Sequence, residues 1–234
     1  MARMFPFITE TWNPLAGGPC PGECSYCWAT DLKNRYKYSK YLGPWRVDEK
    51  VIGKTFKPGA FVFTQDMSDL WAREIPEEIV YKVLQNIRYQ PEVTFLALTK
   101  FPKTYERYAK LIPENVVLGA TVETNRDIPV SKAPYPYDRF NAMLWVTQNL
   151  LNKTFISVEP IMEFDRTELL PVLNYIHPWA IAIGYDNYHN NLPEPPLAKT
   201  LELIDSLRKR GITVFEKTLR SPYLTNGMEK VGGE

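Results

Sequence analysis

The sequence predicts an α/β protein built as a partial (β/α) barrel of about six to seven parallel strands. Seven short apolar runs rich in β-branched residues recur along the chain, and segments with helical periodicity separate most of them. Strands that alternate with helices favour βαβ units and a parallel sheet. The runs are almost continuously apolar, as expected of strands covered on both faces. A doubly wound open sheet is the alternative, because periodicity does not distinguish the two.

The expected elements follow one another in regular order. We predict strands over 7–11, 60–64, 93–99, 115–124, 154–159, 179–185 and 212–217. We predict helices over 76–89, 102–112, 137–151, 166–176 and 196–211. Pro76 and the two acids after it are typical of a helix start. Gly211 is typical of a residue that ends a helix.

The length and composition favour one domain. The chain has 234 residues, of which 44% are hydrophobic, so it can bury a sizeable core. We predict a single domain over 1–220, with a basic and aromatic insertion near 31–57 and a flexible tail over 221–234. The opening residues lack the apolar core of a signal peptide, and no run reaches the roughly 18 apolar residues of a membrane span. These features predict a cytoplasmic protein with no membrane partner.

Polar residues gather where the predicted strands end. In (β/α) barrels this carboxyl-terminal rim carries the functional sites. Each such residue has an alternative interpretation as a helix cap or turn residue. The residues in question are Thr64, Gln65, Asp66, Thr99, Lys100, Thr121, Glu123, Ser157, Glu159, Asp186, Glu216 and Lys217. Carboxylates around one mouth repel each other unless cations lie among them, and a cationic ligand would supply positive charge.

All three cysteines lie in the stretch GGPCPGECSYCWA, with the spacing C-x3-C-x2-C at Cys20, Cys24 and Cys27. A structural zinc site needs four ligands, and a redox pair would leave one thiol unexplained. Iron–sulfur clusters are held by closely spaced thiolates, usually four. Three thiolates leave one iron with an open position, which is typical of a catalytic metal site. Glycines and prolines around the cysteines favour a tight, stiff loop.

The cysteine spacing, with aromatic Tyr26 before the third cysteine, resembles the signature of radical SAM enzymes. The stretches DMSDLW, FLALTKFP, VVLGATVET and FISVEPIM resemble successive motifs of the phage-type three-cysteine proteins, which are similar to the spore photoproduct lyase branch. The resemblance covers roughly residues 8–217. It departs from that group at 184–190, where GYDNYHN replaces a Gly-Gly-Glu-Ser-Gly stretch.

The resemblance implies a [4Fe–4S] cluster on Cys20, Cys24 and Cys27, with S-adenosylmethionine chelated to its fourth iron. An external one-electron donor would reduce the cluster, and the sulfonium bond would break to give a 5′-deoxyadenosyl radical that takes a hydrogen atom from the substrate. The cofactor supplies this chemistry, and the protein positions it.

The resemblance also implies contacts with S-adenosylmethionine. Tyr26 would lie near the adenine. FTQDMSD stands where many radical SAM enzymes carry a Gly-Gly-Glu stretch, so Thr64, Gln65 and Asp66 are its expected substitutes. Thr121 and Glu123 would bind the ribose or the ammonium group. Glu159 would take the adenine side, or else form a buried bond to Lys100 or Lys217.

The segment 31–57 interleaves basic and aromatic residues directly after the cysteines. Basic side chains neutralise phosphates and aromatic faces stack on bases, so a nucleic acid or nucleotide is one candidate substrate. The alternative is a solvated connection whose aromatics pack on the barrel. Two further hypotheses remain from sequence: a radical SAM enzyme acting on a peptide or small molecule, and a non-enzymatic iron–sulfur or zinc protein that binds nucleic acid or senses redox state.

Overall fold

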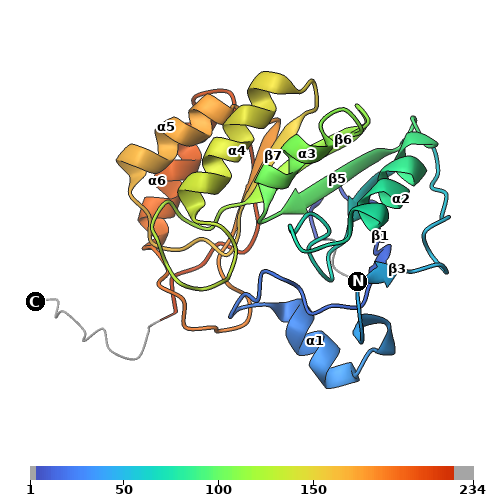
Figure 1. Cartoon of the computed structure of the whole chain (residues 1–234). Coiled ribbons are helices and arrows are strands. Elements are labelled where there is room, and N and C mark those ends of the chain that lie inside the picture. The colour runs from blue at the N-terminus through green and yellow to red at the C-terminus, as the bar shows by residue number, and fades with distance from the viewer. Residues whose placement is uncertain (1–3, 224–234) are drawn as a thin grey trace, which may run out of the picture.

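A curled sheet of seven parallel strands forms the centre of the computed structural model, which describes residues 4–223 (Figure 1). The spatial order is β1-β4-β5-β6-β7-β8-β9, and every neighbouring pair is parallel. The strands are β1 (Glu10–Trp12), β4 (Phe61–Thr64), β5 (Thr94–Thr99), β6 (Val116–Thr121), β7 (Thr154–Val158), β8 (Ala180–Ile183) and β9 (Thr213–Glu216). The predicted α/β partial barrel is confirmed, and all seven predicted strands are present in shortened form.

Helices cover the outer face of this half-barrel (Figure 1). The helices of this layer are α2 (Glu77–Arg88), η2 (Pro102–Thr104), α3 (Tyr105–Tyr108), α4 (Pro136–Asn149), α5 (Arg166–Ile176) and α6 (Leu197–Arg208). Two further helices, α1 (Trp28–Tyr36) and η1 (Ser39–Tyr41), belong to the segment between β1 and β4 and lie apart from this layer (Figure 1). The apolar face of α2, including Val83 and Ile87, packs in one core with Val62 of β4 and Phe95 of β5. This packing explains the helical periodicity of the sequence, because one stripe of each helix faces the sheet.

The inner, concave face has its own small core. Strand alternation places Phe63, Leu96, Val117 and Phe155 on this face, and Phe5 from the N-terminal segment packs among them. Phe5 meets Phe63 and Phe155 edge-on, with ring centroids 5.9 and 5.1 Å away. The N-terminal segment therefore closes the floor of the half-barrel, and polar residues occupy the strand ends above it.

The segment between β1 and β4 contains secondary structure that the sequence did not predict. It contains α1, which directly follows the third cysteine, and a small antiparallel sheet of β2 (Leu15–Ala16) and β3 (Arg46–Val47). Sequence reasoning missed all three elements. Two-residue strands carry no detectable alternation, and α1 buries only Ala29, so its sequence shows no apolar stripe.

The domain limits of 1–220 and 221–234 stay a prediction. Most of the expected flexible tail, residues 224–234, lies outside the described residues. Within residues 4–223, no helix is long and apolar enough to cross a membrane.

Candidate functional site

The three cysteines lie on the loop between β2 and α1, at the rim of the half-barrel (Figure 1). Gly17 and Gly18 begin this loop with φ angles of +80° and +105°. A side chain on Gly17 would place its Cβ 2.0 Å from the carbonyl oxygen of Pro44. The backbone of Gly17 also donates a hydrogen bond to Lys40 O at 2.9 Å. Only glycine permits this close approach of the 31–57 segment to the thiol loop.

A second segment holds the loop from the other side. Ser25 N donates to Val130 O at 2.8 Å, and Lys132 N donates to Gly22 O at 2.8 Å. Trp45 Nε1 donates to Pro19 O at 3.2 Å. The loop is therefore anchored by backbone contacts to two segments that are remote in sequence.

All three thiols are free and half-buried. A Cβ added to Gly22 would lie 3.6 Å from Cys24 Sγ and 3.8 Å from Cys20 Sγ, so both sulfurs border the space that this glycine leaves open. Within residues 4–223, no three Cys, His, Asp or Glu side chains are close enough to hold one metal ion together. Cys20 and Cys24 thus face a common position on the loop.

The charge environment of the thiols is mixed. Burial raises the pKa of the Cys24 thiol to about 11, and Glu123 adds to this while Lys100 opposes it. Burial and the nearby Asp69 carboxylate also raise the pKa of Cys20. Cys27 is the N-cap residue of α1. A cationic iron centre would supply the positive charge that buried thiolates need.

Tyr26 joins the thiol loop to a buried network of charges. Its hydroxyl donates a hydrogen bond to Glu123 Oε1, and the Lys100 ammonium lies 5.2 Å from its ring centroid. Lys100 Nζ bonds the same carboxylate oxygen at 2.7 Å, and Arg139 Nη1 bonds Oε2 at 2.7 Å. Burial opposes the charged form of Glu123, but Lys100 and Arg139 outweigh it and lower its pKa to about 2. Glu123 is an ionised, fully bonded carboxylate.

Glu159 forms a separate ion pair at the rim. Its Oε1 lies 3.0 Å from Lys217 Nζ, and its Oε2 accepts a hydrogen bond of 3.0 Å from Ser157 Oγ. The Lys217 ammonium also lies 4.7 Å from the ring centroid of Phe5, at the floor of the half-barrel. Glu159 therefore makes the lysine bond that the sequence offered as one of its two roles. The chain itself therefore supplies cationic partners to Glu123 and to Glu159.

Thr64, Gln65 and Asp66, the residues expected to replace a Gly-Gly-Glu stretch after β4, differ in their surroundings. Thr64 lies two residues after Val62 in β4, so both side chains are on the helix-covered face of the sheet. Gln65 has a φ of +69°, and its Oε1 accepts a hydrogen bond of 2.9 Å from Leu15 N. The Nε2 atom of Gln65 is buried and has no hydrogen-bond partner among the described residues. Buried unpaired polar atoms are rare in proteins, and Thr64 Oγ1 and Ser68 Oγ nearby in sequence are also without a partner among the described residues.

Asp66 bonds Asn13 instead of lining a free carboxylate site. Asn13 Nδ2 donates to Asp66 Oδ1 at 2.7 Å, and Asp66 N donates to Asn13 Oδ1 at 3.0 Å. Burial raises the pKa of Asp66. This reciprocal pair fixes the β4 loop against the segment that leads into β2.

Thr121 ends β6, two residues before Glu123 on the same face. Its side chain is buried, and its carbonyl oxygen accepts a hydrogen bond of 2.8 Å from Arg139 Nη1. Tyr26, Glu123 and Thr121 are thus brought together at one part of the rim, with Arg139 as the shared partner of the latter two.

Sequence reasoning missed three residues of this site. Arg139 lies in an ordinary helical pattern, so nothing in the sequence distinguishes it. Asn13 and Asp69 act through hydrogen bonds to residues far away in sequence: Asn13 bonds Asp66, and Asp69 accepts hydrogen bonds from Thr99 Oγ1 at 2.7 Å and Lys100 N at 2.9 Å. Asp69 thereby ties the β4 loop to the end of β5, which places Lys100 beside Tyr26.

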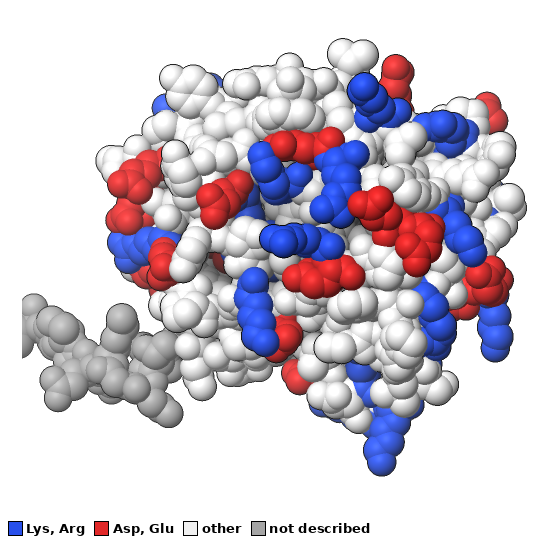
Figure 2. Space-filling view, viewed as in Figure 1, with Lys and Arg blue, Asp and Glu red and all other residues white. Residues whose placement is uncertain are grey.

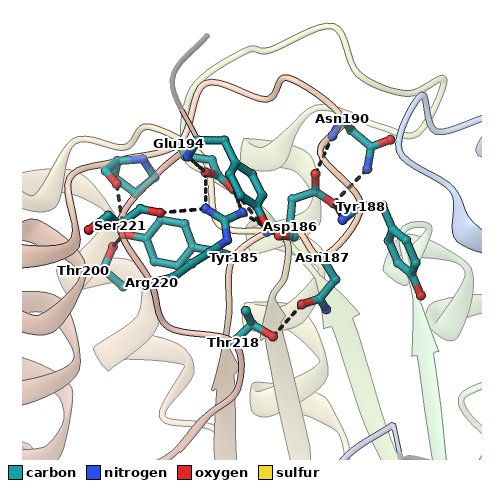
Figure 3. A network of polar contacts seen from close by, with 12 residues as sticks. Tyr185, Asp186, Asn187, Tyr188, Asn190, Glu194, Thr200, Thr218, Arg220 and Ser221 are labelled. Atoms are coloured by element: carbon teal, nitrogen blue, oxygen red, sulfur yellow. Dashed lines mark hydrogen bonds and ion pairs between the residues drawn. The ribbon is translucent and has the colours of Figure 1, made fainter.

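The stretch GYDNYHN forms a closed hydrogen-bonded loop after β8 (Figure 3). Asp186 is buried and accepts hydrogen bonds from Asn190 N at 2.6 Å and Asn190 Nδ2 at 2.8 Å. Arg220 reaches across from the end of the described chain and bonds both carboxylate oxygens of Glu194, at 2.7 and 2.8 Å. Asp186 caps its own loop, so it is a structural residue and not a free acid of the site.

Comparisons with known proteins address the fold and the family. A family model described as "Protein of unknown function (DUF5131)" matches residues 4–186. No curated protein matches the chain. Spore photoproduct lyase in complex with dinucleoside spore photoproduct has a similar structure, with a TM-score of 0.57 at 14% sequence identity. That match covers 87% of this chain and 76% of the lyase.

A second similar structure is SuiB from Streptococcus suis. With S-adenosylmethionine bound, SuiB gives a TM-score of 0.56 at 11% identity, and with its precursor peptide SuiA it gives 0.58 at 9% identity. These matches cover 90% of this chain, which spans about half the length of SuiB. Both similarities concern the fold, and they confirm the partial barrel that the radical SAM resemblance implied. The narrower resemblance to phage-type three-cysteine proteins stays a prediction.

Proposed function

Because the chain belongs to the DUF5131 family, whose description assigns no activity, we propose its function from the site itself: it is a radical SAM enzyme. Cys20, Cys24 and Cys27 would hold a [4Fe–4S] cluster. This cluster, when reduced by an external one-electron donor, supplies the electron that cleaves S-adenosylmethionine and thereby initiates hydrogen-atom abstraction. The similarity in fold to two proteins whose solved structures contain S-adenosylmethionine supports the proposal.

The observation that carries the proposal is the trio of free thiols on one anchored loop at the rim. Closely spaced thiolates are the usual ligands of iron–sulfur clusters, and these three lie on one short loop. Three thiolates leave one iron of a four-iron cluster for another ligand. The sulfurs of Cys20 and Cys24 both face Gly22, which has no side chain to come between them.

The chain's own residues would orient the cofactor. Lys100, next to Tyr26 and Cys24, supplies a cation beside the thiol loop. Gln65 offers a buried donor with no partner of its own among the described residues. Arg139 and Lys100 keep Glu123 ionised, so Glu123 would act by holding Tyr26 and not by receiving a proton. The aromatic floor around Phe5 excludes water from the concave face.

The assay is anaerobic reconstitution with iron and sulfide, followed by measurement of bound iron and of 5′-deoxyadenosine formed under a strong reductant. We expect about four irons per chain and formation of deoxyadenosine from S-adenosylmethionine. Cys20→Ala should abolish deoxyadenosine formation. Ser25→Ala, which changes an exposed residue of the same loop, should retain both iron and product. Bound zinc without iron, or iron without deoxyadenosine, would contradict the proposal.

A further inference from the structure

Three tyrosines form a continuous aromatic series that begins beside the thiols and ends in solvent. Tyr41 packs edge-on against Tyr38, with ring centroids 6.5 Å apart. Tyr38 stacks on Tyr36 at 5.8 Å with an angle of 24° between the rings. Tyr36 is 58% exposed and Tyr38 43% exposed, so their faces are accessible from solvent. We call Tyr36, Tyr38 and Tyr41 the tyrosine ladder.

Lys33 connects this ladder with the thiol site. Its ammonium lies 4.7 Å from the ring centroid of Tyr41. The same lysine is close enough to Cys20, Cys27 and Asp66 for their charges to act on it. The inner end of the ladder therefore lies, through Lys33, within electrostatic reach of two of the cysteines that would hold the cluster.

The segment that carries the ladder is strongly basic. Residues 31–57 contain eight Lys and Arg against three Asp and Glu, which gives a net charge of +5 in a chain of net charge +1. Arg35 and Lys37 flank Tyr36, are exposed, and form no ion pair within residues 4–223. In Figure 2 the lower edge of the molecule, where α1 lies in Figure 1, shows basic side chains among uncharged surface. Such a surface is complementary to a polyanion.

We propose that the tyrosine ladder, together with Lys33, Arg35 and Lys37, binds a single-stranded nucleic acid and leads one nucleotide to the thiol site. Phosphates pair with the three cations, and bases stack on exposed tyrosine faces. Stacking on the tyrosines requires unpaired bases, so the ladder favours a single strand over a duplex. This inference rests on the proposed function only in its last step, the delivery of a nucleotide to the thiol site; strand binding by the ladder does not depend on it.

Hydrogen bonds fix the position of residues 31–57, which favours a binding role for this segment over that of a loose connection. Gly17 N and Gly18 N donate to the carbonyl oxygens of Lys40 and Gly43, which ties the end of the ladder to the thiol loop. Lys40 Nζ bonds Asp48 at 2.7 Å and Asn13 O at 2.6 Å, so it is already engaged. The ladder is thus held in place by contacts other than those that the nucleic acid would use.

The test is fluorescence anisotropy of labelled 12-nucleotide DNA and RNA strands with the reconstituted protein at several salt concentrations. We expect binding that weakens with salt, with a slope of log K against log salt near about −2 for three phosphate contacts. Tyr36→Ala with Tyr38→Ala should weaken binding by at least about tenfold, since each stacked base contributes on the order of 1–3 kcal/mol. Tyr36→Phe with Tyr38→Phe keeps the ring faces and should retain binding.

The matched control replaces Tyr89 and Tyr175 by Ala, because both are exposed tyrosines far from the ladder in sequence. This control should bind as the wild type does. Absence of strand binding, equal binding by the Tyr36→Ala/Tyr38→Ala variant, or equally good competition by polyglutamate would overturn the inference. Deoxyadenosine formation without any oligonucleotide is measured in parallel. If that product forms but no strand binds, the inference alone has failed; if strands bind but no product forms, the proposed function alone has failed.

Discussion

The hydroxyl of Tyr26 donates a hydrogen bond to Glu123, across 97 residues of sequence. Tyr26 lies between two of the cysteines, and Glu123 follows β6 of the half-barrel. Lys100 and Arg139 fix Glu123 from two further elements, the end of β5 and α4. The position of the thiol loop is therefore set by the sheet itself, through one side-chain hydrogen bond in addition to its backbone contacts.

Tyr26→Phe should remove this connection while keeping the aromatic ring. We expect the free energy of unfolding to fall by about 1–3 kcal/mol, since a hydrogen bond to a buried charge is lost. Iron incorporation should also slow or fall, because the thiol loop loses its bond to the sheet. Urea denaturation of the apoprotein and the iron content after anaerobic reconstitution measure the two effects.

Tyr105→Phe is the matched control for that change. The Tyr105 hydroxyl is buried as well, and it donates to Ala97 O and Gly119 O, each at 2.9 Å, away from the thiol loop. It should lose stability but retain normal iron incorporation. If both variants incorporate iron equally well, the Tyr26 hydroxyl does not position the thiols.

Glu123 should make the stability of the protein depend on pH in the acid range. Its pKa is lowered to about 2 in the folded chain, against 4.5 for an ordinary glutamate. A lowered pKa stabilises the fold above the unfolded value, and this contribution disappears as the pH falls from about 4.5 towards 2. The shift corresponds to about 3 kcal/mol at neutral pH.

Glu123→Gln tests that contribution. The variant should be less stable than the wild type by about 3 kcal/mol or more at pH 7, because Lys100 and Arg139 lose their counterion in a buried site. The difference should shrink steadily below pH 4.5. Urea denaturation at a series of pH values measures it, and a difference that stays constant down to pH 3 would rule out the paired, ionised state of Glu123.

The order of strands and the position of the cysteines could be predicted from sequence, because each depends on a local pattern. Apolar runs and helical stripes record which residues face the sheet, and the spacing of Cys20, Cys24 and Cys27 is visible directly. The partners of the rim acids could not be predicted in the same way. Arg139 reaches Glu123 only because the chain brings α4 beside β6. No periodicity in the sequence records such a pairing.

The surroundings of individual rim residues could not be predicted from local sequence patterns either. Thr64 and Gln65 are neighbours in sequence, yet strand alternation assigns Thr64 to the helix-covered face. Gln65 takes a left-handed backbone conformation, which no local signal for a glutamine predicts. Glu159 pairs with Lys217, which directly follows β9, the last strand of the sheet, and its expected place on the adenine side stays a prediction.

Gly17→Ala should destabilise the protein far more than Gly43→Ala. Both glycines have positive φ angles, +80° and +77°, so both substitutions carry backbone strain of about 1 kcal/mol. Only at Gly17 would the new Cβ lie 2.0 Å from a backbone oxygen, that of Pro44, whereas the space around Gly43 is open to 4 Å. We expect a further loss of about 2–3 kcal/mol for Gly17→Ala from this collision.

Thermal or urea denaturation of the two variants provides the measurement. The Gly17→Ala protein should also incorporate less iron, because the thiol loop must shift to relieve the contact. Equal stability of the two variants would mean that the backbone of Pro44 does not lie in close contact with Gly17.

The ion pair between Arg220 and Glu194 should contribute far more to the free energy of unfolding than an exposed ion pair of the same N–O distance. Arg220 bonds both oxygens of Glu194, whose side chain is 2% exposed, and Tyr223 N donates to the same carboxylate at 2.8 Å. Arg220→Ala would leave a buried carboxylate without its counterion, so we expect a loss of about 3 kcal/mol. The pair of Arg166 with Glu202 is also 2.7 Å long but solvent-exposed, so Arg166→Ala should cost less than about 1 kcal/mol.

The Arg220 substitution should also release the end of the described chain from the loop after β8. The Arg220 guanidinium carbon lies 3.3 Å from the ring centroid of Tyr223, which in turn stacks on His189 at 3.6 Å. Loss of the guanidinium removes the contact that holds both rings in place. Hydrogen exchange of residues 186–194 should therefore rise in Arg220→Ala and stay unchanged in Arg166→Ala. Unchanged exchange in both variants would show that Arg220 does not hold the loop, and that Asp186 closes it alone.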